Sequence, residues 1–333
     1  MSRFITLSHG NGGKHMRLLI EEIFAKHLSN DLLDTNCDAA LLPELNKRLM
    51  MTVDSFTVQP LFFPGGDIGS LCIHGTVNDL AVSGAIAKFI SLSAIIEEGL
   101  AFDMLDAIVK NMAQAANACG VSIVCGDTKV VPRGQGSEVY FTTTGIGYQS
   151  SLVNYSASLV KPGDKILVSG TVGDHGAAIM LSREQFGLSG NIQSDNASVL
   201  PVCQSVYGLE GIRFMRDPTR GGIASVMHEI SQSTGHGIQL NELDVPVLDE
   251  VRTICDMLGY EPYYMANEGC VVAIVDAAIA EDVLHLWRNE HNARYASIVG
   301  EVTDRHNQVV IKTAIGGERM LPELVDEPLP RIC

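Results

Sequence analysis

The chain has 333 residues, of which 46% are hydrophobic and 19% charged, and its formal net charge is −16 at pH 7. This length suggests about two domains, and this hydrophobic content excludes a disordered chain. The acidic balance excludes a basic nucleic-acid surface, and no apolar stretch or signal peptide indicates a membrane protein. An anionic small molecule remains possible if metal ions and a few local cations reverse the field.

The cysteine pattern indicates the compartment. Eight cysteines are scattered along the chain and form no CxxC pair, so neither a zinc site nor a disulfide framework is indicated. We therefore expect a reducing, cytoplasmic environment in which the internal cysteines are small buried hydrophobic residues.

The first motif is HGNGGK at residues 9–14, which predicts a glycine-rich turn before an amphipathic helix over 16–28. Glycines followed by a helix start can cradle a phosphate group. A P-loop is excluded because the four-residue gap and the Ser or Thr after Lys14 are missing. A plain turn with a helix cap remains an equal alternative.

The remaining first half alternates strands and helices, predicted at 49–53 (strand), 75–85 (helix), 89–96 (strand), 102–116 (helix), 121–124 (strand) and 139–147 (strand). The first strand ends at Asp54, and the third leads into Asp127 and Lys129. Asn78 and Asp79 lie on a helix of small residues, where polar side chains must find partners. An internal hydrogen-bond network would satisfy them as well as a ligand.

A polar stretch at 150–158 predicts a domain boundary. Further alternation follows, with predicted strands at 166–170, 270–275, 296–302 and 308–313 and predicted helices opening at GDHG (173–176) and spanning 277–289. A second glycine-rich turn, MRDPTRGG at 215–222, precedes another helix. We expect an N-terminal domain over 1–155, a C-terminal domain over 156–322 and a tail over 323–333.

The tail ends in Cys333, which can enter a narrow pocket because no residue follows it. EPLP at 327–330 favours polyproline backbone and hence a semi-rigid arm. Prenylation would require three residues after the cysteine. The alternative is an ordinary chain end without a role.

Four acidic residues share a context of glycines, small residues or element ends: Asp38, Asp54, Asp79 and Asp127. Their oxygens are ligands that Mg²⁺ accepts together with nucleotide phosphates. Taken as spacing alone, four such residues could also be coincidence.

Six motifs occur in one order: HGNGG (9–13), TVD (52–54), NDLA (78–81), GDT (126–128), DPTRGG (217–222) and NEG (267–269). This order resembles the ATP-using superfamily of aminoimidazole ribonucleotide synthetase, selenophosphate synthetase and thiamine monophosphate kinase, over nearly the whole chain. With the terminal PRIC, the chain most resembles the HypE family of hydrogenase maturation factors.

The resemblance implies an α/β fold of two PurM-like domains, with ATP and Mg²⁺ between them. The N-terminal domains would pair into a homodimer, and an extended tail would follow the C-terminal α+β domain. Asp54, Asp79 and Asp127 would bind Mg²⁺. Asp38 would be a further ligand, although its neighbour Cys37 replaces an acid that relatives often carry.

The resemblance also implies roles for other residues. Glu268 would be a base, Lys129 would meet phosphate or the tail, and Cys333 would carry the reacting group. The residues toward the nucleotide would be Gly12, Gly13, Asn78, Asp127, Thr219 and Arg220.

The implied activity is that of a carbamoyl dehydratase. A HypF-type carbamoyltransferase would load the terminal thiol, ATP would activate the carboxamide oxygen, and loss of phosphate would leave a thiocyanate. The cyano group would pass to a HypC–HypD type complex and reach [NiFe]-hydrogenase iron. ADP and phosphate would be released.

The sequence allows two other functions to be compared with this one. Selenophosphate synthetase has its reactive residue near the N-terminal glycine loop, yet no cysteine precedes Cys37 here. A non-catalytic carrier could dock partners through the tail, but a pure scaffold would not need the acidic motifs and Lys129.

Overall fold

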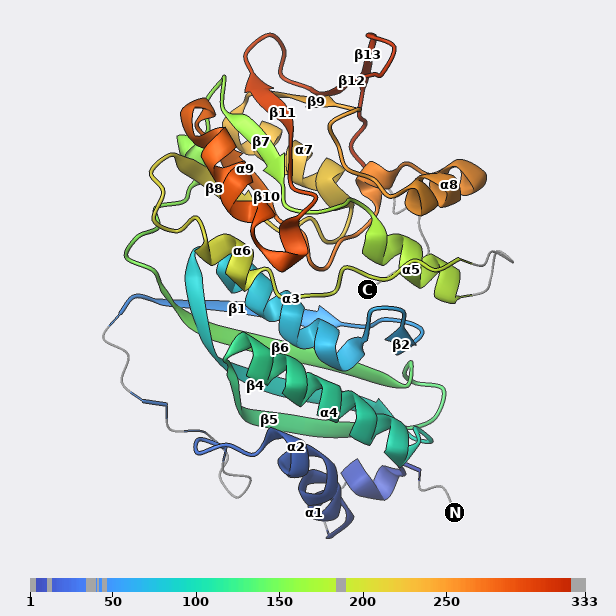
Figure 1. Cartoon of the computed structure of the whole chain (residues 1–333). Helices are drawn as coiled ribbons and strands as arrows, with labels where there is room; N and C mark the ends of the chain where they lie inside the picture. Colours follow the sequence, from blue (N-terminus) through green and yellow to red (C-terminus); the bar gives the residue numbers. More distant parts are fainter. Residues whose placement is uncertain are drawn as a thin grey trace.

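The computed structural model describes residues 4–10, 14–33, 40, 42–43, 47–183 and 190–324. Two main sheets divide these residues, one in each half of the chain (Figure 1). The first sheet has the strand order β1-β6-β4-β5, and the second has the order β13-β12-β9-β11-β7-β10-β8. The predicted boundary near residue 155 falls between them and stays a prediction.

The first sheet consists of β1 (Leu49–Phe56), β4 (Ala85–Glu97), β5 (Ser122–Val131) and β6 (Val139–Gln149). β6 pairs antiparallel with both β1 and β4, whereas β4 and β5 are parallel. Parallel neighbours need a crossover connection, and α4 (Phe102–Cys119) supplies it. Two short strands, β2 (Phe62–Phe63) and β3 (Gly66–Asp67), form a separate hairpin before α3 (Ile68–Val82).

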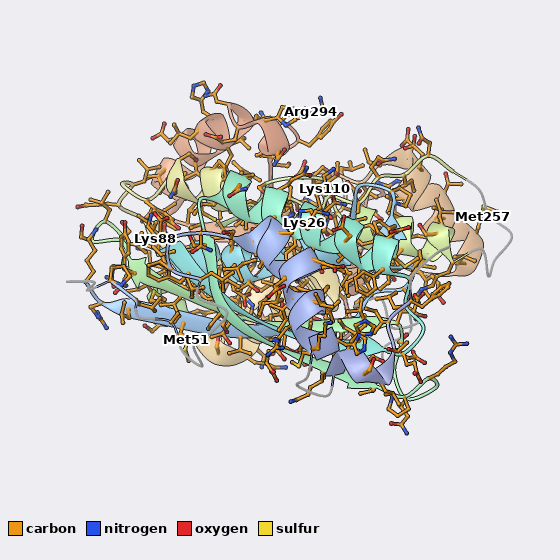
Figure 2. The ribbon with its side chains drawn as sticks, turned by 90° about the horizontal axis from the view of Figure 1, so that it is seen from below. Lys26, Met51, Lys88, Lys110, Met257 and Arg294 are labelled. Atoms are coloured by element: carbon orange, nitrogen blue, oxygen red, sulfur yellow. The ribbon has the colours of Figure 1, made fainter. Side chains whose placement is uncertain are left out.

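In the described part of the chain, helices cover one face of the first sheet. The other face, which we call the open face, exposes side chains of β1. α3 and α4 pack together on the covered face, and α3 lies between this sheet and α6 (Leu200–Gln204) of the second half (Figure 1). β1 alternates strictly, so its outward residues Leu49, Met51 and Val53 are 60%, 69% and 57% exposed. Figure 2 places Met51 and Lys110 of α4 on opposite sides of the sheet.

α3 is buried nearly all round because both halves of the molecule pack on it. It begins seven residues earlier than the predicted 75–85. Asp67 forms a capping box there, accepting hydrogen bonds from the amides of Gly69 (2.6 Å) and Ser70 (3.1 Å). The small-residue pattern had indicated the later turns alone.

The second sheet consists of β7 (Lys165–Val168), β8 (Ile212–Arg216), β9 (Gly237–Asn241), β10 (Val272–Val275), β11 (Ser297–Thr303), β12 (Val309–Lys312) and β13 (Glu318–Met320). Its pairs are antiparallel except β9 with β12. One hydrophobic cluster joins this sheet to α7 (Gly222–Thr234), and another joins it to α9 (Ala280–Arg288).

The remaining helices belong to both halves of the molecule. The N-terminal helices are α1 (Lys14–Leu19), η2 (Ile20–Ala25, π-helical) and α2 (Lys26–Leu28), of which η2 and α2 lie against α4. The core of the first half extends into α5 (Asp174–Ser182) and α8 (Asp249–Leu258), so the halves share buried contacts. The other short helices are α6 (Leu200–Gln204), η1 (Leu7–Gly10), η3 (Ala157–Leu159), η4 (Pro262–Tyr264), η5 (Ala277–Ile279) and η6 (His291–Ala293).

Two predicted strand ends were wrong. β1 continues to Phe56, so Asp54 lies inside the strand rather than at its end. β5 continues to Val131, so Asp127 and Lys129 are strand residues. In both cases long-range pairing with a neighbouring strand extends the element past its apolar run.

Among the helices of the described residues, none is both long and apolar enough to cross a membrane.

Candidate functional site

Acidic side chains from both halves of the chain gather where α3 meets the second half. Asp54 comes from β1, Asp79 from α3, Asp217 from the turn after β8 and Glu268 from the loop before β10. Asp217 and Glu268 are 8% and 5% exposed, and Asp54 and Asp79 are half-buried. Their charges act on one another: Asp54, Asp79 and Asp217 all raise the pKa of Glu268.

Asp54 and Asp79 form one side of this cluster. Thr52 Oγ1 donates to Asp79 Oδ2 at 2.7 Å, and the Ser55 amide donates to Asp54 Oδ1 at 2.7 Å. Burial raises the pKa of Asp54 to about 6, against the lowering effect of the Ser55 hydrogen bond and of Arg220. Burial also raises the pKa of Asp79. Both groups therefore hold protons more tightly than exposed carboxyls do.

The chemistry of this pair suits a hard cation. Two desolvated carboxylates repel each other, and a bound cation offsets that repulsion better than a proton does. Within the described ranges no group of three or more His, Cys, Asp or Glu side chains is placed to hold a metal ion. Mg²⁺ held by Asp54 and Asp79 would therefore take its other ligands from water and phosphate, as it commonly does.

Glu268 is a buried carboxyl whose pKa is shifted. Burial raises its pKa well above the ordinary value, and the charge of Asp195 is the next cause. Burial likewise raises the pKa of Asp217 to about 7. A carboxyl in this state is a strong proton acceptor once it is ionised, which is the property of a general base.

The second glycine-rich turn borders the cluster. Gly222 begins α7 with φ 59°, and a Cβ there would lie 2.5 Å from the carbonyl oxygens of Tyr263 and Met265. A glycine is therefore needed for α7 to start this close to η4. Arg220 lowers the pKa of Asp54, which places its charge beside the carboxylates. A helix N-terminus next to an arginine suits a phosphate group.

Asn78 is occupied by protein backbone. Its Nδ2 donates to the carbonyl oxygens of Ala197 (3.0 Å) and Glu268 (3.2 Å), and its Oδ1 accepts from the Val199 amide (2.8 Å). The sequence left open an internal hydrogen-bond network at this residue, and the structure contains one. The predicted contact of Asn78 with a nucleotide stays a prediction.

Asp127 and Lys129 lie apart from the cluster. They are on edge strand β5, three strands from Asp54 on β1, which corresponds to about 14 Å at normal strand spacing. Asp127 is one residue out of register with Asp54, so it points to the open face. Both side chains are exposed, and Lys129 Nζ lies 3.7 Å from Asp127 Oδ2. Within one chain the structure does not unite the three predicted Mg²⁺ ligands.

Four predicted site residues, Gly12, Gly13, Asp38 and Cys333, lie outside the described residues, and their roles stay predictions. Sequence reasoning also missed several buried polar groups next to the cluster. Asp217 belongs to a motif that was noticed, but it received no role. Asp195 carried no motif at all, and it contacts the Glu268 loop directly.

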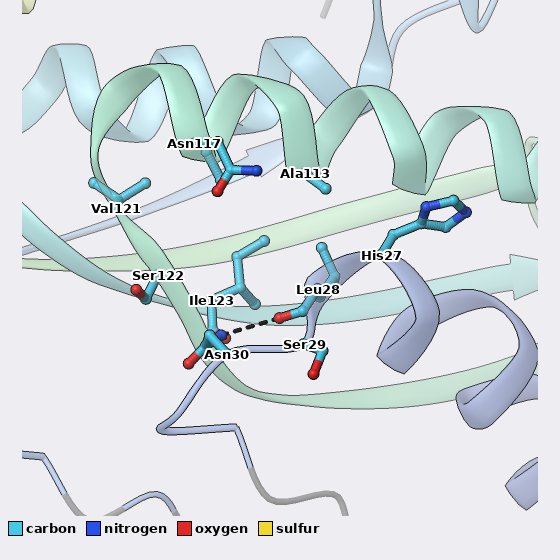
Figure 3. Close-up of a pocket in the computed structure, with 10 residues that line it drawn as sticks. His27, Leu28, Ser29, Asn30, Ala113, Asn117, Val121, Ser122 and Ile123 are labelled. Atoms are coloured by element: carbon cyan, nitrogen blue, oxygen red, sulfur yellow. Dashed lines mark hydrogen bonds between the residues drawn. The ribbon is translucent and has the colours of Figure 1, made fainter.

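A separate hollow lies between α2, α4 and the start of β5 (Figure 3). Its lining includes His27, Asn30, Asn117 and Ser122, and Asn30 Nδ2 donates to the Leu28 carbonyl oxygen at 3.0 Å across its floor. It contains none of the candidate carboxylates, so we do not assign the predicted chemistry to it.

Comparisons with known proteins agree with this architecture. Residues 36–149 match the family model described as AIR synthase related protein, N-terminal domain, and residues 161–312 match the model of the corresponding C-terminal domain. These matches define a two-domain protein of the AIR synthase related class, which confirms the predicted fold.

The relatives define the family more narrowly. The chain is 44% identical to carbamoyl dehydratase HypE of Azotobacter vinelandii, over 99% of this chain and 97% of that protein. It also matches the crystal structure of the hydrogenase maturation protein HypE in complex with ATP, with a TM-score of 0.92, 42% identity and coverage of 98% and 99%. A crystal structure of a HypE–HypF complex matches with a TM-score of 0.81, 43% identity and coverage of 92% and 99%. The chain belongs to the HypE family, as the motifs predicted.

Proposed function

We propose that this chain is an ATP-dependent carbamoyl dehydratase of hydrogenase maturation, which converts an S-carboxamide on Cys333 into an S-cyanate. Family membership supports the class of reaction. The observation that carries the proposal is Glu268, a buried carboxyl whose pKa is raised by burial and by neighbouring carboxylates that include Asp54 and Asp79, on a loop whose Asn267 amide donates to the Pro218 carbonyl oxygen of the glycine turn at 3.1 Å.

The reaction needs both a phosphoryl donor and a base. The carboxamide oxygen attacks the γ-phosphorus of ATP, and ADP leaves. The phosphorylated oxygen then departs as phosphate, the carboxamide nitrogen loses both its protons, and a carbon–nitrogen triple bond forms on sulfur. An amide oxygen is a poor leaving group, whereas a phosphate is a good one. Glu268 would accept a proton from nitrogen.

The nucleotide would lie between the two halves. Asp54 and Asp79 would hold Mg²⁺, which offsets phosphate charge in a chain whose net charge is −16. Thr219 and Arg220 at the start of α7, together with Gly12 and Gly13, would contact phosphate.

The root of the tail supports a role for Cys333. Leu321 is 1% exposed, and its carbonyl oxygen accepts a hydrogen bond from His228 Nε2 at 2.9 Å. The Tyr264 hydroxyl donates to the Pro322 carbonyl oxygen at 2.7 Å. Leu324 lies against Gly221, because a Cβ on that glycine would be 3.7 Å from Leu324 Cδ1. The described chain therefore ends beside the glycine turn.

The remaining length is sufficient for an intramolecular reaction. Nine residues, 325–333, follow Leu324, and an extended segment of this length spans at most about 30 Å. Tethering the reacting group in this way replaces a bimolecular encounter with a local one. We propose that Cys333 reacts in the site of its own chain.

A homodimer is proposed through the open face of the first sheet. Leu49, Met51 and Val53 expose apolar surface there, which a second copy would cover. Asp127 and Lys129 lie on the same face. Any part that Asp127 plays in Mg²⁺ binding would therefore depend on the pairing of two chains.

Two further partners complete the proposal. A HypF-type carbamoyltransferase would load Cys333, which the HypE–HypF complex of a 43% identical relative supports. A HypC–HypD type complex would accept the cyano group, as the family resemblance implies.

Intact-mass analysis of the C-terminal peptide tests the proposal. After incubation with a carbamoyl-donor partner, addition of Mg²⁺ and ATP should remove one water from the carbamoylated Cys333 peptide and release ADP and phosphate. Cys333→Ala should abolish the modification and leave the thermal melting temperature unchanged, because a chain-end residue contributes little to a core. Dehydration in the Ala variant, or a modification on an internal cysteine, would refute the proposal.

A further inference from the structure

The segment 194–199, which we call the strap, lies between helix α3 and the loop that carries Glu268. Asn196 uses both ends of its amide on α3: its Nδ2 donates to Ser70 Oγ at 2.9 Å, and its Oδ1 lies 2.9 Å from His74 Nδ1. Asn78, one turn further along, binds the strap backbone at residues 197 and 199. These three α3 positions are four residues apart and share one helix face.

Asp195 connects the strap to the loop that carries Glu268. Its Oδ1 accepts from the Glu268 amide at 3.0 Å, and its Oδ2 accepts from the Gly269 amide at 3.0 Å and from Asn267 Nδ2 at 2.9 Å. One carboxylate therefore binds three consecutive residues, 267–269, of the loop before β10, which we call the base loop.

The contact leaves no room for adjustment. A Cβ on Gly269 would lie 1.8 Å from the Asp195 carbonyl oxygen, so the two backbones touch and position 269 must be a glycine. Asn267 is fixed on two further sides, because it accepts from the Gly173 amide at 3.0 Å and donates to the Thr171 carbonyl oxygen at 3.0 Å.

These contacts connect the two halves of the candidate site. α3 carries Asp79 one residue after Asn78, and the base loop carries Glu268. The strap binds both elements, so it sets the separation between the carboxylate that would face Mg²⁺ and the carboxyl that would accept a proton. A base works when it is within hydrogen-bond reach of the proton it removes.

We propose that Asp195 is a positioning residue for dehydration, which holds the Asn267 side chain and the backbone of Glu268 and Gly269 against the strap so that the Glu268 carboxyl faces the reacting group. Asp195 does not itself touch substrate. The inference rests on the proposed role of Glu268 as base.

The main test is Asp195→Asn in the full chain. In one orientation of the new amide its NH₂ group opposes the Glu268 amide, and in the other it opposes the Gly269 amide and Asn267 Nδ2, so the loop must move in either case. A displacement of about 1 Å at a catalytic group costs about 100-fold in rate. We expect dehydration of carbamoylated Cys333 to slow about 100-fold, measured by intact mass in a single turnover. Gln193→Ala, an exposed position in the same stretch, is the matched control and should keep the wild-type rate.

Two further readouts separate positioning from general loosening. The rise in melting temperature with Mg²⁺–ATP should be retained in Asp195→Asn, because the Asp54–Asp79 pair is untouched. The acid limb of the rate profile should also move to lower pH. The charges that raise the pKa of Glu268 are those of Asp195, Asp217, Asp54 and Asp79, and this variant removes the first. Glu268 must be ionised to act, so a lower pKa extends activity to lower pH.

The outcomes are distinguishable. Wild-type turnover in Asp195→Asn beside an inactive Glu268→Gln would overturn this inference alone, whereas normal turnover in Glu268→Gln would remove the base and both proposals. If Asp195→Asn does not fold, Asn196→Ala decides. Loss of the two side-chain bonds from Asn196 to α3 should slow dehydration by up to about 30-fold, as expected for two hydrogen bonds, and a wild-type rate would overturn the inference.

Discussion

The two edge strands of the first sheet, β1 and β5, carry acidic motifs that look equivalent in sequence. They differ in the face that the aspartate occupies, in its burial and in its charged neighbours. Asp54 on β1 faces α3, is half-buried and has a pKa raised to about 6. Asp127 on β5 faces the open side, is exposed and lies 3.7 Å from Lys129 Nζ. Burial next to another carboxylate prepares a group for a cation or a proton, whereas an exposed pair is already neutralised by water and its partner. The environment, and not the motif, decides the chemistry.

The largest expected effect comes from the buried side of this comparison. Glu268→Gln is nearly isosteric and cannot accept a proton, so dehydration should fall by about 1000-fold, within the range typical of general bases. Mg²⁺–ATP should still raise the melting temperature. Asp127→Asn, which removes one charge from the exposed edge, is the matched comparison, assayed at a protein concentration where chains are monomeric. Normal turnover in Glu268→Gln would mean that burial at this site serves the fold alone.

The second prediction concerns Mg²⁺ binding and compares Asp79, on the covered face, with Asp127, on the open face. A ligand that binds the native state raises the melting temperature by mass action. Asp79→Asn should lose most of the rise produced by saturating Mg²⁺–ATP. Asp127→Asn should keep this rise in dilute protein, and any loss should grow with protein concentration as chains pair through the open face.

One result would contradict this prediction about Asp79 and Asp127. Equal losses in Asp79→Asn and Asp127→Asn at every concentration would show that the two residues act at one site within a single chain. Without nucleotide, Asp127→Asn should change the free energy of unfolding by no more than about 0.5 kcal/mol, as is usual for exposed positions.

The smallest effect concerns pH and Mg²⁺ without ATP. The folded-state pKa of Asp54 is about 6 and that of Asp217 about 7, both above the ordinary value of 3.8. Between pH 4 and 7 the folded chain therefore binds more protons than the unfolded chain, so these groups make stability fall as pH rises. Mg²⁺ competes with those protons and should raise the melting temperature more at pH 7.5 than at pH 5.

Asp54→Asn is the control for this measurement, because it removes one of the titrating groups and should flatten the fall in stability. A Mg²⁺ effect that is equal at both pH values would contradict the proposed competition between cation and protons.

The sequence by itself determined the family and much of the alternation of strands and helices, and it singled out Asp54, Asp79 and Glu268 of the candidate site. The order of six short motifs identifies the family even where a predicted strand end is wrong, because that order does not depend on where single elements begin or end. Glycine at 222 is an example of a residue type that the local backbone requires, because a Cβ there would meet the carbonyl oxygens of Tyr263 and Met265.

The tertiary structure alone decided which side chains share an environment. A strand alternates its side chains between two faces, so one step of register across β1, β6, β4 and β5 sends Asp127 to the face opposite Asp54. Asn78 and Asp195 meet the Glu268 loop from 190 and 73 residues away in the chain, in contacts without any local pattern. Local sequence specifies turns and periodicity, whereas the free energy of burying a carboxylate depends on neighbours that folding brings from elsewhere in the chain.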